Sequence, residues 1–70
     1  MTMQEFETVY NLGKYYQAEM AHGGNALKLK VEIKQLRENL KSWAKDRKNF
    51  NAVIFQREFV KAFSEGCHAC

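Results

Sequence analysis

The fold of this chain is decided by residues 20–26, MAHGGNA, where two glycines separate two long and mainly apolar patterns. On both sides the pattern recurs at steps of three and four, which is the spacing of one face of an α-helix. The first pattern comprises Met3, Phe6, Tyr10, Gly13, Gln17 and Met20, and the second comprises Ala26, Leu29, Ile33, Leu36, Leu40 and Trp43. Corresponding members are equidistant from Gly23, so the sequence predicts two antiparallel helices joined by a short turn.

Polar residues and glycine at the ends of these patterns predict where the helices begin and end. Thr2 and Glu5 have the spacing of a capping box at the start of the first helix. Gly23 can adopt the left-handed backbone that ends many helices, and Asn25 is a good N-cap for the next one. We therefore expect helices over about 2–21 and 26–47.

A third helix is expected over about 52–65, after the Asn-rich break at residues 48–51. Residues 50–55 also suit a strand because they are rich in aromatic and β-branched side chains. Phe59, Ala62 and Phe63 have helical spacing, which favours a helix that ends at Gly66.

These elements predict an all-α fold, in which a long antiparallel hairpin carries a shorter third helix packed across it. One domain is expected over residues 1–66, followed by a flexible tail at 67–70. Gly13 is the mirror partner of Ile33, so we expect the first two helices to approach closely there. Trp43 and Met3 form the outermost mirrored pair, and core packing is expected for Trp43.

Composition limits the class of protein. The chain has 70 residues, 46% of them hydrophobic, no proline and a net charge of +3. A single small core is therefore expected, with limited stability of its own. No apolar run approaches the length of a membrane span, and no signal peptide is recognisable, so a cytoplasmic protein without membrane contact is expected.

The third helix carries a wider apolar face than one groove of a hairpin can cover, roughly half of its circumference. Leu27 and Val31 add apolar surface on the back of the second helix. Excess apolar surface favours self-association or a protein partner. We therefore expect a small non-catalytic interaction module, a homodimer, with Phe55, Phe59 and Phe63 as its main anchors. Tight wrapping of the third helix around the hairpin is the alternative.

A basic row on the second helix supports an alternative function. Its members recur at helical spacing and are Lys30, Lys34, Arg37, Lys41, Lys45 and Lys48. Such a row can contact several phosphates of a nucleic acid, so a small DNA- or RNA-binding regulator is the second hypothesis. Lysine is also the ordinary solvent-facing residue of a helix, and the row can simply bias approach toward an acidic partner.

The chain closes on Cys67-His68-Ala69-Cys70, whose two cysteines supply half of a tetrahedral zinc site. His22 and His68 are the only histidines that could complete it, so metal binding is a weak candidate and no cofactor is expected. A redox role is weaker still, because active dithiols lie at helix N-termini and these cysteines follow a helix. No pattern of nucleophile and base or of paired carboxylates is present, so the sequence does not predict an enzyme.

Overall fold

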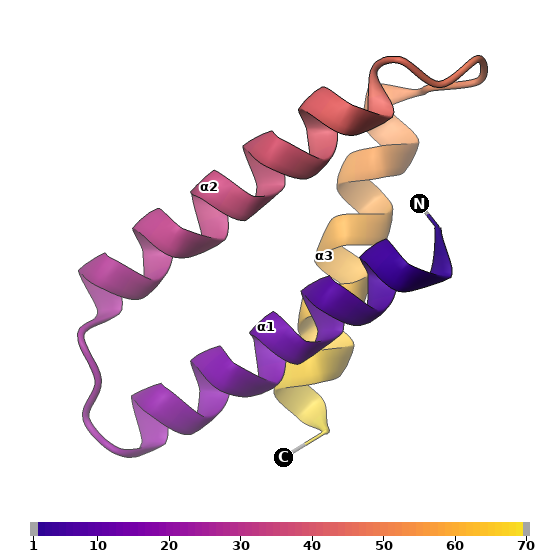
Figure 1. Cartoon of the computed structure of the whole chain (residues 1–70). Coiled ribbons are helices and arrows are strands. Elements are labelled where there is room, and N and C mark those ends of the chain that lie inside the picture. The colour runs from indigo at the N-terminus through magenta and orange to yellow at the C-terminus, as the bar shows by residue number, and fades with distance from the viewer. Residues whose placement is uncertain (1, 70) are drawn as a thin grey trace.

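The computed structural model describes residues 2–69, which form three helices: α1 (Met3–Ala21), α2 (Ala26–Ala44) and α3 (Ala52–His68). The predicted all-α fold is confirmed, and the alternative strand at residues 50–55 is wrong. In Figure 1, α1 and α2 run antiparallel and are joined by a short turn, while α3 crosses behind them.

The helix starts follow from local hydrogen bonding, as predicted. The Thr2 hydroxyl accepts from the Glu5 N–H at 3.2 Å, and a Glu5 carboxylate oxygen accepts from the Thr2 N–H at 3.0 Å. The side chains of Asn25 and Asn51 each accept from two backbone N–H groups at the starts of α2 and α3. Gly23 takes φ +78° in the turn after α1, a backbone conformation that glycine adopts without strain.

The closest packing in the molecule is between α1 and α3, and two glycines make it possible. A methyl group on Gly13 would clash with the carbonyl oxygen of Phe63, and one on Gly66 would clash with the carbonyl oxygen of Tyr10. The predicted close approach of Gly13 to Ile33 is therefore wrong. The atoms nearest to a methyl group on Gly13 all belong to α3. Gly13 therefore allows the backbones of α1 and α3 to cross in close contact.

Two predicted helix ends need correction. Gly66 lies inside α3, which continues to His68, because its missing side chain is needed for contact with α1. The helix α2 stops at Ala44, three residues earlier than expected, and residues 45–49 form turns that lead toward α3.

The core lies where the three helices meet, close to the C-terminal half of α2. Its buried members are Val9, Leu40, Ala44, Phe55, Phe59 and Ala62. The α1 face that points inward is centred on Val9 and Gly13, so the predicted stripe is displaced around the helix and leaves Met3 and Gln17 exposed. Trp43 is 62% exposed, and its predicted core packing is wrong because the open end of the hairpin is splayed.

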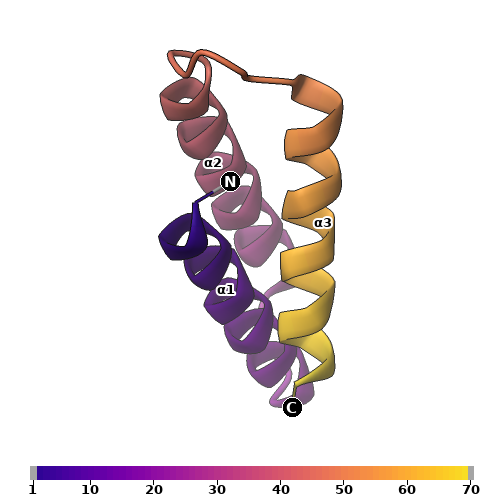
Figure 2. The same ribbon diagram turned by 90° about the vertical axis from the view of Figure 1, so that its right-hand side faces the viewer.

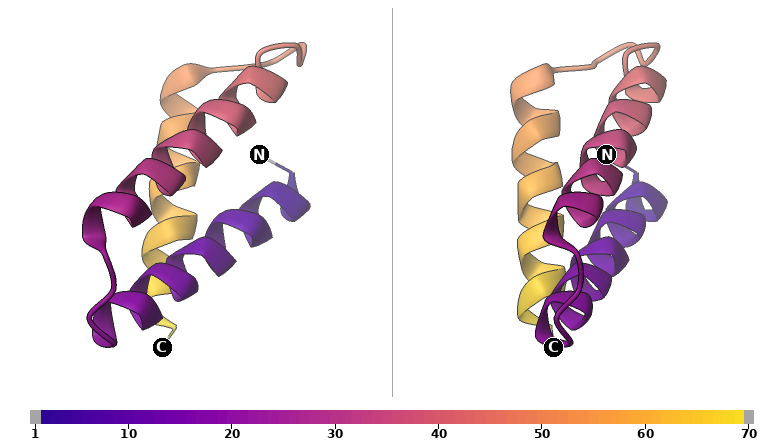
Figure 3. Two further views of the ribbon diagram at one scale, coloured as in Figure 1. Left: turned by 60° about the vertical axis from the view of Figure 1, so that its left-hand side comes forward. Right: turned by 90° about the vertical axis from the view of Figure 1, so that its left-hand side faces the viewer.

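The helix α2 packs less closely on its neighbours than α1 and α3 pack on each other. Figures 2 and 3 show α2 inclined away from α1 toward the loop that leads into α3. Arg47, in that loop, donates to both carboxylate oxygens of Glu5 at 2.7 and 2.8 Å. This ion pair ties the far end of α2 to the first turn of α1.

Electrostatics reinforce this connection. The hydrogen bonds from Arg47 hold the pKa of Glu5 at about 2, well below its ordinary value of 4.5, against the opposing effect of burial. The backbone N–H of Thr2 also lowers the pKa of Glu5. The hydrogen bond with Glu5 in turn raises the pKa of Arg47. One carboxylate therefore both caps α1 and anchors the loop after α2.

None of the helices in residues 2–69 combines the length and the apolarity that a membrane crossing requires.

Candidate protein-binding groove

A groove of about 380 Å³ lies between α2 and α3 on the outside of the core. It exists because α2 stands off from α3 while both helices turn large side chains toward the space between them. The residues that line it are Lys30, Ile33, Lys34 and Arg37 from α2 and Gln56, Phe59, Val60 and Phe63 from α3.

The floor of the groove is apolar. Phe59 also belongs to the core, so the floor continues the hydrophobic interior to the surface. Ile33 and Phe63 are half-buried and pack against that core, whereas Val60 remains 53% exposed at the edge. Phe63 is held by Tyr16 of α1, whose ring centroid lies 5.5 Å from its own. The tight α1–α3 pair therefore positions the aromatic part of the groove.

The α2 edge of the groove is basic. Lys30, Lys34 and Arg37 recur at steps of four and three, which places all three on one side of the helix. Neither lysine forms an ion pair with another of residues 2–69, and Arg37 has a long contact of 3.5 Å to its exposed neighbour Glu38. No Asp or Glu lines this groove, so the residues that line it carry a net positive charge.

The three predicted aromatic anchors differ in burial and in position relative to the groove. Phe55 and Phe59 are only 5% and 4% exposed, whereas Phe59 and the half-buried Phe63 line the groove. The tilted Phe55 and Phe59 rings pack with their centroids 6.4 Å apart, and both belong to the hydrophobic core. Leu27 and Val31 are exposed on α2, so both are accessible to a partner.

The basic row is shorter than its sequence spacing suggests. Lys30, Lys34, Arg37 and Lys41 lie on α2, and Lys45 is its C-terminal cap residue. Lys48 lies beyond the end of the helix, so the prediction that it extends the row along α2 is wrong. Only the first three members line the groove.

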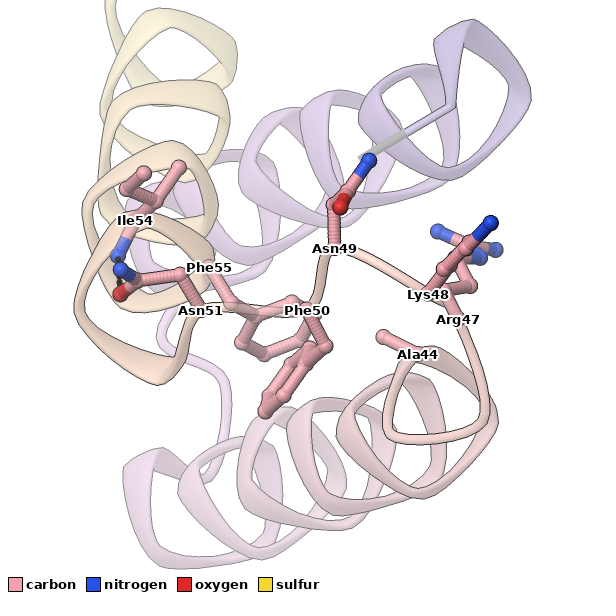
Figure 4. A pocket seen from close by; sticks show the side chains of 8 residues that line it. All are labelled: Ala44, Arg47, Lys48, Asn49, Phe50, Asn51, Ile54 and Phe55. Atoms are coloured by element: carbon pink, nitrogen blue, oxygen red, sulfur yellow. Dashed lines mark hydrogen bonds between the residues drawn. The ribbon is translucent and has the colours of Figure 1, made fainter.

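Lys48 instead lines a separate pocket of about 340 Å³ at the loop between α2 and α3 (Figure 4). The rings of Phe50 and Phe55 lie side by side there, with centroids 6.1 Å apart. This pocket is poorly suited to an anion. Arg47 already binds Glu5, and the N–H groups that open α3 already donate to the side chain of Asn51.

The structure describes only part of the terminal cysteine motif. Within residues 2–69, no group of three His, Cys, Asp or Glu side chains could hold a metal ion. Cys67 lies in α3 with its Sγ 3.4 Å from the Gly13 carbonyl oxygen, and His22 caps the end of α1. The other two candidate ligands are His68, which is the last residue of α3, and Cys70, which lies outside the described residues.

Sequence reasoning missed two contributions to this site. Gln56 and Val60 form the α3 edge of the groove, and their helical spacing relative to Phe63 was a usable signal. The pair between Glu5 and Arg47, which fixes the loop at the end of α2, joins residues 42 apart and has no signal in local sequence.

Comparison with known proteins returned no match among family models, curated proteins or solved structures.

Proposed function

We propose that this chain is a non-catalytic protein-binding module that holds an apolar helical segment of a partner in the groove between α2 and α3. The single observation that supports it best is the composition of that groove. An apolar floor continuous with the core is bordered by cations and contains no carboxylate. Grooves of this kind accept the apolar face of a helix.

Exposed apolar side chains beside the groove support the same proposal. Val60 lies at its α3 edge, and Val53 lies two helical turns earlier on the same side of α3. On α2, Leu27 lies two turns before Lys34. A partner that covered these residues would remove apolar surface from water, and that burial is a main source of free energy in protein association.

A nucleic-acid partner is the second candidate, and the exposed Lys30 and Lys34 favour it. Phosphates would use these cations but not the apolar floor between the helices. The homodimer expected from the sequence also stays a prediction, and sedimentation equilibrium of the purified chain tests it directly.

The proposal is tested by selecting binders from a displayed library of helical peptides of unrestricted composition. Val60→Arg should weaken the selected peptides at least about tenfold, because a charged group would then enter the apolar contact. Ile54→Arg is the matched control, since Ile54 lies on the same helix, is 52% exposed and does not line the groove. Equal loss in both variants would contradict the proposed site.

A labelled 20-base-pair duplex is titrated in parallel at low and high salt. Binding of the duplex that falls steeply with salt, together with recovery of no peptide, would favour the nucleic-acid alternative. Binding of peptides that survives at high salt supports the apolar groove, since burial of apolar groups is only weakly screened.

A further inference from the structure

We infer that the partner of the α2–α3 groove is an acidic amphipathic helix of another protein, with its carboxylates along one flank of its apolar face. This inference rests on the proposed function and adds the chemistry and the orientation of the partner.

The positive charge of the groove lies along its α2 edge. Lys30, Lys34 and Arg37 follow one another at about one helical turn, so they form a line parallel to the axis of α2. Carboxylates at steps of three and four on a partner helix have the same spacing. A helix lying along the groove can therefore pair with this edge over two successive turns.

The two edges of the groove differ in charge. The α3 edge presents Gln56 and Val60, which carry no charge. A partner helix with carboxylates on both flanks would place one set beside Val60 and gain nothing there. The groove therefore favours acidic residues on the flank that faces α2, and uncharged residues on the flank that faces α3.

Charge disfavours a second copy of this chain in the same groove. In a two-fold symmetric contact the same patch meets itself, so the two basic edges would lie in one interface. The most acidic helix of the chain, α1, has Glu5 committed to Arg47 and therefore offers few carboxylates to a neighbour. Like charges at an interface oppose association, and here they act against self-pairing.

The experiment uses the full chain and a second displayed library of amphipathic helices. Every member has the same leucine face, and each flanking position is Glu, Gln or Lys. Sequencing of the bound pool should show Glu enriched on one flank and Gln retained on the other. The orientation is checked by paramagnetic labels placed at one end of a selected peptide.

Charge at the groove edge is then removed by Lys30→Gln with Lys34→Gln. We expect selected acidic peptides to bind about fivefold more weakly and to lose part of their salt dependence, because two exposed charge pairs are lost. Lys28→Gln with Lys61→Gln is the matched control, as it removes the same charge from exposed helical positions outside the groove. That control should change affinity less than twofold, a small effect because its charges lie outside the contact.

The outcomes separate the inference from the proposed function. Peptides that bind in the groove without charge enrichment, and that ignore the lysine substitutions, overturn the acidic partner and leave the groove as a protein-binding site. Enrichment of Lys overturns the inference in the same way. A library that yields no peptide sensitive to Val60→Arg overturns both.

Discussion

The contact between α1 and α3 and the placement of α2 are two different ways of joining helices in one small domain. At the first, Gly13 and Gly66 let the two backbones touch, and neither glycine position has room for a side chain. At the second, α2 meets its neighbours through Leu40 and Ala44 and through the pair between Glu5 and Arg47.

The difference shows where surface for a partner can arise. A crossing at backbone contact leaves no space, whereas a helix that packs only through its side chains leaves room for a groove beside it. The candidate groove lies beside α2 for this reason, and its aromatic floor is supplied by α3, which packs closely on α1.

The largest loss of stability is expected for Gly66→Ala. We expect a loss of about 3 kcal/mol in the free energy of unfolding, because the added methyl group meets the Tyr10 backbone, which cannot move independently. The measurement is urea unfolding followed by circular dichroism. Ser64→Ala, on the exposed side of the same helix, should leave the midpoint unchanged or slightly higher. A stabilised Gly66→Ala variant would mean that the crossing is looser than described.

A smaller effect is expected at the α2 end. Glu5→Gln should lower the free energy of unfolding by about 1–2 kcal/mol, since it removes the charge from a paired and hydrogen-bonded group. Glu7→Gln, on the exposed side of α1, should have little effect. Arg47→Gln should add almost nothing to Glu5→Gln in a double-mutant cycle, and full additivity would show that the pair is not energetically coupled.

Acid should weaken the same connection in a defined range. The pKa of Glu5 is lowered from 4.5 to about 2 in the folded chain, so the unfolded chain takes up this proton first. The contribution of Glu5 to stability is therefore complete above pH 4.5 and is lost as the pH falls toward 2. Unfolding midpoints measured across this range should decline less steeply in Glu5→Gln than in the unmodified chain. Parallel declines would contradict the role given to Glu5.

The smallest effect is expected at Trp43, on the splayed end of the hairpin. Trp43→Ala should cost less than about 1 kcal/mol, because most of this side chain already faces water. It is the only tryptophan, so its emission spectrum reports directly on the site and should be that of a solvent-exposed indole. A blue-shifted emission would place Trp43 against α1 and close the hairpin.

Local chemistry made the helix starts predictable but left open which helices pack against each other. The side chains of Thr2, Asn25 and Asn51 act on N–H groups two or three residues away, so their roles can be read from adjacent residues. Gly13 offered no such information. A glycine on an apolar face indicates a close approach, but its neighbour can be any helix with a matching small residue.

Gly66 was that matching residue, and its position near the end of the third pattern made it resemble a helix stop. The same difficulty applies to the groove. The basic edge was visible in the spacing of Lys30, Lys34 and Arg37. The apolar floor was not, because whether Phe59 and Phe63 face a partner or the core depends on which helices touch.

The pairing of the first helix with the last has a consequence for synthesis of the chain on the ribosome. While α3 is still unmade, the α1 face around Val9 and Gly13 has no surface to cover it, and the turn at Gly23 brings only α2 nearby. The α1–α3 pair can therefore form only after α3 has emerged, and a nascent chain halted before Ala62 would display the inner face of α1 to chaperones.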